Sequence, residues 1–212
     1  FVINDLNRTY EGENFCFSYS PFDKQVVYNA TMKGARILVQ AGKNSEEAKK
    51  TVEFVLKNQK EDGAWSYAKG DTREWADNFH TGYILDCLQE YMELTKDDSV
   101  KRWLEKGVEY YVENFFYENR IPKYYNKRIY PIDSTAVAQS ILTLCRFGYM
   151  DMAKRVIEWA IENMYDEKGY FYYRKYKYYT NKISYMRWSN AWMLTGLSYY
   201  LVKSEKKKMP TN

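Results

Sequence analysis

Histidine and cysteine are scarce in this sequence, and their scarcity limits the chemistry that it can carry out. There is one histidine, and Cys16, Cys87 and Cys145 lie far apart without a C-x-x-C pair, so a metal site is not indicated. Cys87 and Cys145 fall inside apolar runs, where we expect buried, reduced thiols. Reduced thiols favour a reducing compartment, so the sequence predicts a cytoplasmic protein without a metal or cofactor.

Signals of several other protein classes are also missing. No stretch reaches roughly 18 consecutive apolar residues, and the chain does not open with a signal-peptide pattern, so no membrane span is predicted. The sequence contains no G-x-S-x-G, P-loop or G-x-G-x-x-G motif. The net charge of +4 is too small to indicate nucleic acid, because residues 203–208 supply much of the excess.

Length and composition otherwise indicate a globular protein that is rich in tyrosine. The 212 residues suffice for one domain, which we place at residues 1–203, followed by a polar tail at residues 204–212. Tyrosine occurs 23 times, and many copies lie in expected loops. The first residue is Phe1 rather than methionine. This leaves open that the chain is the C-terminal part of a longer protein, whose N-terminal part would be a further partner.

An internal repeat organises the chain. Four segments rich in small and apolar residues start about every 50 to 56 residues: 29–42, 79–94, 134–147 and 189–202. Between them, residues 45–57, 98–116 and 150–164 alternate charges with an apolar stripe. A helix that is apolar nearly all round must be covered on every side, whereas an amphipathic helix can face water. The alternation predicts an all-α fold, an α/α toroid or an arc of one, with inner helices wrapped by outer helices.

An aromatic loop precedes each expected inner helix. The four loops, residues 11–19, 62–67, 118–124 and 166–172, combine a turn signal with aromatic residues, as short β-hairpins do. In a toroid these loops converge at one rim, beside helix N-termini with unpaired N–H groups and positive dipole ends. That rim is where we expect a concave polar site.

The rim carries residues suited to a sugar, whose C–H faces stack on rings while its hydroxyls bind polar groups. His80, in the first turn of an inner helix, suits proton transfer near neutral pH. Asp77 and Asp133 complete the catalytic candidates. The candidate substrate-binding residues are Arg187, Trp188, Trp75, Tyr130, Tyr185, Tyr19, Asp23, Asn190 and Trp65.

Each candidate also has a structural explanation. Asp77 and Asp133 stand where a helix N-cap belongs. His80 can be a hydrogen-bonded structural residue, and Arg187 can pair internally instead of binding an anion. The basic aromatic stretch at residues 172–179 could bind single-stranded nucleic acid. Its alternation fits a hairpin with exposed lysines better, and an acidic polymer stays open as a partner.

One segment resembles a known repeat. Residues 54–65, FVLKNQKEDGAW, resemble the Q-x-x-x-G-x-W repeat of squalene and terpenoid cyclases, which are α/α toroids. The acidic D-x-D-D and D-D-x-x-D motifs of those enzymes have no match in this sequence. The resemblance therefore implies the toroid fold and argues against cyclase chemistry.

A second resemblance covers nearly the whole chain. Its runs are SYSPFD (18–23), WADNFHTG (75–82), YPID (130–133) and MRWSNAW (186–192). They resemble a group of bacterial and archaeal proteins from polysaccharide-biosynthesis clusters. The α/α domain of that group is distantly similar to the helical domain of glucuronyl C5-epimerases and to six-hairpin glycosidases and lyases. Members usually extend further upstream than Phe1.

We therefore expect a carbohydrate-active protein of cell-surface polysaccharide biosynthesis: an epimerase, lyase or hydrolase of uronic-acid-containing glycans. In an epimerase or lyase, Arg187 would hold the substrate carboxylate while His80 or a rim tyrosine moved the C5 proton. In a hydrolase, Asp77 and Asp133 would be acid and base. A non-catalytic glycan-binding or scaffolding module is the alternative, and a terpenoid-cyclase-like enzyme is the least favoured. If the protein is an enzyme, we expect His80, Asp77 and Asp133 to face one shared cavity. If it is a binding module, these three residues can be buried in helix caps while only aromatic residues are exposed.

Overall fold

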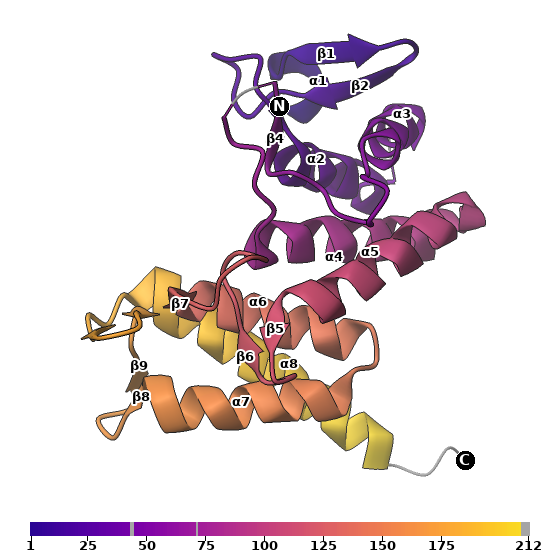
Figure 1. Ribbon diagram of the computed structural model, residues 1–212. Coiled ribbons are helices and arrows are strands. Elements are labelled where there is room, and N and C mark those ends of the chain that lie inside the picture. The colour runs from indigo at the N-terminus through magenta and orange to yellow at the C-terminus, as the bar shows by residue number, and fades with distance from the viewer. Residues whose placement is uncertain (43–44, 71, 209–212) are drawn as a thin grey trace. The chain divides into compact units, whose positions relative to one another are not determined.

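The computed structural model describes residues 1–42, 45–70 and 72–208 of the chain. They form two compact units, Phe1–Tyr111 and Val112–Asn212, of which the second is described as far as residue 208. Both units are built mainly from helices joined by short strands (Figure 1). The two units are described in turn.

The first unit begins with a hairpin and continues with helices. Its elements are α1 (Val2–Asp5), β1 (Arg8–Glu11), β2 (Asn14–Phe17), β3 (Val26–Val27), α2 (Tyr28–Gln40), α3 (Ser45–Lys57), β4 (Ala68–Lys69), α4 (Asn78–Thr95), the 3-10 turn η1 (Asp98–Val100) and α5 (Lys101–Asn114), which runs into the second unit. Helix α2 packs against both α3 and α4, and strand β2 lies against α3.

Helices α2 and α4 form the core of the first unit because their contacting faces are small and apolar. Met32 and Ala35 of α2, and Leu85 and Leu88 of α4, are fully buried. Helix α3 is amphipathic: Val52, Phe54 and Val55 are buried, while its acidic and basic residues face outward. This confirms the predicted alternation of inner and outer helices within the unit.

The segment that resembles the cyclase repeat, residues 54–65, contains the end of α3 and contacts α5. The Gln59 side-chain amide donates to the carbonyl oxygens of Gly63 and Trp103, each at 3.0 Å. Nε1 of the buried Trp65 ring donates to the carbonyl of Val55 at 2.9 Å. Gly63 has φ +93°, and a Cβ on it would lie 2.5 Å from the carbonyl oxygen of Lys106. The motif therefore serves packing and backbone pairing in this protein.

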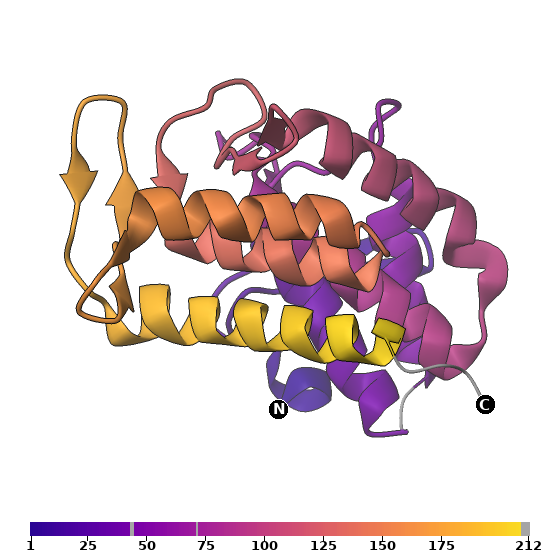
Figure 2. The same cartoon turned by 90° about the horizontal axis from the view of Figure 1, so that it is seen from below.

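The second unit repeats the helical plan. Its elements are β5 (Phe116–Tyr117), β6 (Ile121–Pro122), β7 (Ile132–Asp133), α6 (Ser134–Arg146), α7 (Met150–Met164), β8 (Tyr165–Asp166), β9 (Tyr170–Phe171), β10 (Arg174–Lys175), β11 (Thr180–Asn181), the π-helical turn η2 (Met186–Ala191) and α8 (Trp192–Lys208). Helix α6 packs between α7 and α8, as Figure 2 shows, and Ala136, Val137 and Ile141 of α6 are fully buried.

The helices lie where the sequence predicts them, with differences at their ends. The helices at the four positions predicted as inner cover 28–40, 78–95, 134–146 and 192–208. The last of them is not covered on every side as predicted, because Leu194, Leu201 and Val202 are at least half-exposed. The last begins three residues later than predicted, because residues 189–191 belong to the π-helical turn. It also continues to Lys208, so residues 204–208 of the predicted tail are helical. Residues 209–212 of that tail lie outside the described residues.

Three of the four predicted loop hairpins form: β1–β2, β5–β6 and β8–β9. The second loop is different. Residues 62–67 contain no strand, and the following Ala68–Lys69 pairs instead with Val26–Val27, the residues that precede α2. This pairing brings the approach to α4 beside the start of α2, and so joins two inner-helix N-termini in one unit.

The three cysteines are buried and unpaired, as predicted for Cys87 and Cys145. Burial raises the pKa of the Cys16 thiol to about 11, and that of Cys87 and of Cys145 to about 12. In the described part of the chain, no helix combines the length and the apolar character that a bilayer crossing requires.

Candidate functional site

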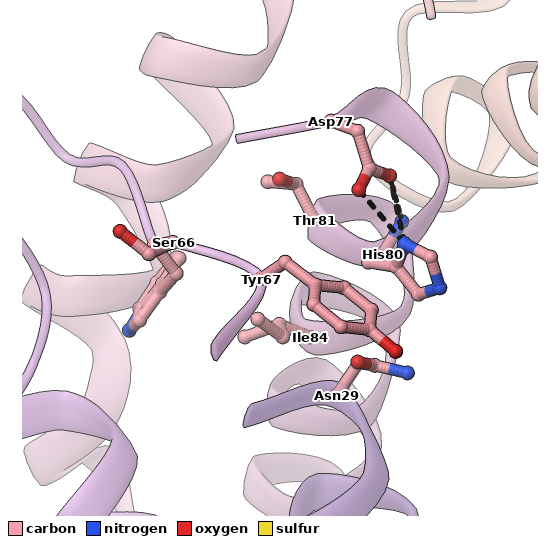
Figure 3. Close-up of a pocket in the computed structure, with 8 residues that line it drawn as sticks. Asn29, Ser66, Tyr67, Asp77, His80, Thr81 and Ile84 are labelled. Atoms are coloured by element: carbon pink, nitrogen blue, oxygen red, sulfur yellow. Dashed lines mark hydrogen bonds and ion pairs between the residues drawn. The ribbon is translucent and has the colours of Figure 1, made fainter. Parts of the chain in front are cut away.

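The N-terminus of α4 holds a carboxylate–imidazole pair. Asp77 is the N-cap of α4, and its Oδ1 accepts a hydrogen bond from the backbone N–H of His80 at 2.9 Å. The His80 ring turns back toward the same carboxylate, with Nδ1 at 2.9 Å from Oδ1 and 2.8 Å from Oδ2 (Figure 3). The Asp77 side chain is buried, whereas 23% of the His80 side chain is exposed.

Local sequence produces this geometry. An aspartate N-cap receives the N–H group three residues later, and the side chain at that position lies close enough to reach back to the cap. Because a carboxylate only accepts hydrogen bonds, Nδ1 of His80 must carry a hydrogen. In the neutral ring, Nε2 is then the nitrogen that is left to accept a proton.

Aromatic rings line one side of this pair. The Tyr67 ring meets the His80 ring edge-on, with centroids 4.6 Å apart and an interplanar angle of 71°. Tyr67 is also stacked on Trp75 at 5.7 Å and 13°. The Tyr67 backbone N–H donates to the carbonyl of Trp75 at 2.8 Å, which holds the two rings together. Trp75 is 40% exposed, so one part of its surface remains available to a ligand.

A small pocket lies between these groups and the start of α2, and its lining packs so closely that no water molecule fits in it. It is lined by Asn29, Trp65, Ser66, Tyr67, Asp77, His80, Thr81 and Ile84. Figure 3 shows the Tyr67 ring extending from beside His80 toward Asn29. Trp65 lies in the floor and is fully buried, so its ring offers no face for sugar stacking.

Tyr19 and Asp23 share a turn in the first unit. Asp23 accepts hydrogen bonds from the backbone N–H groups of Tyr19 at 3.2 Å and Gln25 at 2.9 Å. A hydrogen bond from the Ser20 hydroxyl lowers the pKa of the Asp23 carboxyl. Asp23 therefore organises its own turn, and Tyr19 stands exposed beside it.

The N-terminus of α6 holds a different pair in the second unit. Asp133 is the N-cap, and its Oδ1 accepts from the backbone N–H of Thr135 at 2.9 Å. Its Oδ2 accepts from Nε and Nη2 of Arg174 at 2.9 and 2.7 Å. Strands β7 and β10 place Arg174 directly opposite Asp133. The side chains are 4% exposed for Asp133 and 25% exposed for Arg174, so this is a largely buried ion pair.

Aromatic rings surround this ion pair as well. The Arg174 guanidinium lies 4.8 Å from the centroid of the Tyr173 ring. Tyr173 meets Tyr185 edge-on at 5.0 Å, and Tyr185 lies 5.7 Å from Trp188. Trp188 is half-exposed, and the exposed Arg187 guanidinium lies 5.6 Å from its ring centroid. Both residues belong to the π-helical turn η2, a local structure that often occurs at functional sites.

The last two candidates, Asn190 and Tyr130, also lie in the second unit. Asn190 accepts from the backbone N–H of Phe171 at 2.8 Å and donates to the Ser184 hydroxyl at 2.9 Å, so it fastens the loop before α8. Tyr130 is half-buried and precedes the cis peptide bond to Pro131.

The structure thus groups the candidates by unit. His80, Asp77, Trp75 and Trp65 come together in the first unit. Asp133 lies in the second unit, as do Tyr185, Trp188 and Arg187. Both aspartates are helix caps, which was the structural explanation considered for each.

Sequence reasoning left Tyr67 and Arg174 out of its candidates. Tyr67 follows the pattern of an aromatic loop before an inner helix, which could have indicated it. The pairing of Arg174 with Asp133 spans 41 residues of sequence and leaves no local signal. Among residues 1–42, 45–70 and 72–208, no group of three histidine, cysteine or acidic side chains is arranged to hold a metal ion.

Solved structures share this fold at low sequence identity. A GH76 α-mannanase from Bacteroides thetaiotaomicron matches 98% of the chain with a TM-score of 0.68 and 13% identity, over 60% of its own length. An unsaturated glucuronyl hydrolase specific for heparin matches 91% of the chain with a TM-score of 0.64 and 18% identity, over 63% of its length. A possible GH105 member from Salmonella enterica matches 97% with a TM-score of 0.68 and 13% identity, over 64% of its length.

The chain therefore spans about six-tenths of the length of these structures. No protein-family model matches the sequence, and no curated protein matches it. At such identities the likeness establishes the fold: the protein is all-α, of the α/α toroid class to which these glycosidases belong. This confirms the predicted fold class, while the resemblance to biosynthesis-cluster proteins stays a sequence-based prediction.

Proposed function

We propose that this protein is part of an enzyme that acts on uronic-acid-containing glycans, with His80 as the proton-transferring group and Asp77 as the group that orients it. The observation that carries the proposal is the Asp77–His80 pair in a pocket walled by aromatic rings. The buried carboxylate sets the tautomer of the imidazole and stabilises the imidazolium that forms when Nε2 accepts a proton. The His80 side chain is 23% exposed, so a ligand can contact the ring.

This arrangement supports proton abstraction, as in an epimerase or lyase, better than hydrolysis by two aspartates. The C5 proton of a uronate lies beside a carboxylate, so its removal requires a base and a means of stabilising the developing charge. Asp77 and Asp133 already accept hydrogen bonds in their caps and from His80 or Arg174. A glycosidase acid must instead have a carboxyl group that is free to donate a proton to the glycosidic oxygen.

A carbohydrate substrate is supported by the rings and by the similar structures. Trp75 in the first unit and Trp188 in the second each expose a ring on which a sugar can stack. We assign Arg187, beside Trp188, to an acidic group of the glycan, because its guanidinium is exposed and can form a bidentate contact with a carboxylate. The similar structures include a mannanase and a heparin-specific glucuronyl hydrolase.

The place of this activity in the cell follows from the sequence. The resemblance to polysaccharide-biosynthesis proteins supports a role in making cell-surface polysaccharide. Three buried, unpaired thiols fit a reducing compartment, so we place the enzyme in the cytoplasm.

The reaction can be tested with purified protein and uronate-containing oligosaccharides. Deuterium uptake at C5 from D₂O reports epimerisation, ultraviolet absorbance of a new C4–C5 double bond reports elimination, and new reducing ends report hydrolysis. We expect one of the first two signals in wild type and its loss in His80→Gln. Equal rates in both proteins would contradict the assignment of His80, and new reducing ends alone would contradict the proton-abstraction class.

A non-catalytic glycan-binding module is the second candidate. Two observations favour this candidate. Asp77 and Asp133 both act as helix caps, and Trp75, Trp188 and Tyr19 are exposed. A module binds uronate oligosaccharides without changing them, and His80→Gln leaves that binding intact. Loss of binding in Trp75→Ala or Trp188→Ala, together with no turnover in wild type, would establish it.

A further inference from the structure

Asn29, the second residue of α2, is a buried polar side chain with an unsatisfied oxygen. It is 6% exposed, and its Oδ1 is buried without a hydrogen-bond partner in the described part of the chain. An unsatisfied buried acceptor destabilises a fold, so such a group calls for an explanation. Asn29 lines the same pocket as Asp77 and His80.

The usual structural uses of a buried asparagine are not found here. The N-cap of α2 is Val27, with no side-chain cap, and Asn29 itself ties no loop among the described residues. Other asparagines of the chain show what such a tie looks like: Asn7 donates to the carbonyls of Pro21 and Asp23 at 2.9 and 2.8 Å. The unsatisfied oxygen is therefore not explained by the fold.

The other polar groups of the pocket indicate what would satisfy it. Asp77 presents only acceptors, and with Nδ1 protonated the Nε2 of His80 is an acceptor too. The Ser66 hydroxyl donates to the carbonyl of Glu74 at 3.2 Å. The Tyr67 and Thr81 hydroxyls, which also line the pocket, can both donate and accept, so the pocket suits a group that does both, such as a sugar hydroxyl. The buried Asp77 carboxylate disfavours a second carboxylate beside it.

We infer that Asn29 is a substrate-contacting residue whose Oδ1 accepts a hydrogen bond from a sugar hydroxyl seated beside His80. The inference rests on the proposed function and adds that this pocket holds a hydroxyl-bearing edge of the sugar, while the uronate carboxylate points away from it. Tyr67 lies on a non-helical segment and forms the wall that must move for the hydroxyl to reach Oδ1.

The test uses binding of both anomers of methyl glucuronide and of their 2-, 3- and 4-deoxy analogues. His80 is the only histidine, so in protein without a histidine tag its ring signals in NMR spectra report binding beside it directly. In Asn29→Leu, we expect the parent glucuronide to bind about tenfold more weakly. The deoxy analogue that lacks the contacting hydroxyl should bind wild type and Asn29→Leu equally.

Thr51→Val is the matched control. Thr51 is fully buried in α3, its Oγ1 also lacks a hydrogen-bond partner among the residues that the structure describes, and it does not line the pocket. Both substitutions remove an unsatisfied oxygen, so neither should lower the melting temperature, and only Asn29→Leu should weaken binding. If Asn29→Leu lowers the melting temperature, Asn29→Ala gives the same comparison without the added bulk.

The outcomes separate this inference from the proposed function. Equal binding of the parent glucuronide by wild type and the Asn29 variant overturns the inference and leaves turnover by His80 standing. Hydroxyl-dependent loss of binding without turnover in wild type supports the inference and overturns the proposed enzyme. Wild type that binds neither anomer overturns both.

Discussion

Both carboxylate oxygens of Asp77 lie within 2.9 Å of Nδ1 of His80, and one of them also caps the helix on which the histidine stands. One carboxylate thus performs two tasks, helix capping and imidazole orientation. The first is a structural task and the second is useful mainly to a ring that transfers protons.

The tautomer of His80 is the first testable consequence. We expect the neutral ring to carry its hydrogen on Nδ1, because Asp77 only accepts. The ¹⁵N shifts of the imidazole measure this, and a single histidine makes assignment unnecessary. Asp77→Asn offers an amide donor and should increase the population with hydrogen on Nε2. A predominantly Nε2–H ring in wild type would contradict the arrangement.

The two tasks of Asp77 can be separated by substitution. Asp77→Ala removes both and should lower the free energy of unfolding by about 1 kcal/mol or more. Asp77→Ser keeps a capping oxygen but loses the partner of the His80 ring, so we expect near-wild-type stability with strongly reduced turnover. Denaturant unfolding and the turnover assay measure the two effects. Full activity in Asp77→Ser would show that the cap is the only role of this carboxylate.

The Asp133–Arg174 pair should matter for stability in a different way. Arg174→Met leaves a nearly buried carboxylate without its cation, which should cost roughly 2–4 kcal/mol, somewhat less than for a fully buried pair because Arg174 is partly exposed. Adding Asp133→Ser removes the unpaired charge and keeps a capping group. We therefore expect the double variant to be more stable than Arg174→Met alone. A double variant that is less stable would mean that the carboxylate stabilises the fold without Arg174.

Helical features of this protein were predictable because they depend on neighbours in sequence. The spacing of apolar residues placed α3 at residues 45–57 and α7 at residues 150–164, the bounds that the structure shows. Asp77 and Asp133 were recognisable as N-caps for the same reason, because capping involves the next few residues only.

Features that depend on distant residues were not predictable. Arg174 was interpreted as one basic residue of an aromatic hairpin, and only the pairing of β10 with β7 reveals its carboxylate partner. The loop at residues 62–67 was predicted as a hairpin, but Ala68–Lys69 finds its partner strand before α2. Trp65 was predicted to bind substrate because its aromatic loop precedes an inner helix, whereas packing buries it fully.

Gly63 allows a sharp test of the repeat that resembles the cyclases. Its φ is +93° and a Cβ would collide with the carbonyl oxygen of Lys106, so Gly63→Ala should be strongly destabilising. Gly169 is the matched control, because its φ is +91° and a Cβ there would meet nothing within 4 Å. Gly169→Ala should cost about 1 kcal/mol for backbone strain alone. Denaturant unfolding measures the free energy of unfolding that each variant loses. Equal losses would show that a clash with Lys106 adds nothing to the cost at Gly63.

The buried thiols predict weaker folding at alkaline pH. Burial raises the pKa of Cys87 and of Cys145 to about 12, whereas a thiol in the unfolded chain titrates near pH 8.5. A raised pKa in the folded state gives stability that is complete below the unfolded pKa and is lost as pH rises toward the folded value. Each thiol then lowers the free energy of unfolding by up to about 1.4 kcal/mol per pH unit in that window.

Denaturant unfolding between pH 8 and 11 measures this loss. Cys87→Ala removes one of the titrating groups, so its stability should fall less steeply with pH than that of wild type, even though its stability at pH 7 is lower because of the cavity. Cys145→Ala should flatten the curve in the same way, since the two thiols share one cause and one pKa range. Parallel curves for wild type and both variants would contradict the assignment of alkaline unfolding to Cys87 and Cys145. The remaining sources would be Cys16, whose pKa burial raises to about 11, and buried tyrosines such as Tyr91, whose pKa burial raises to about 12.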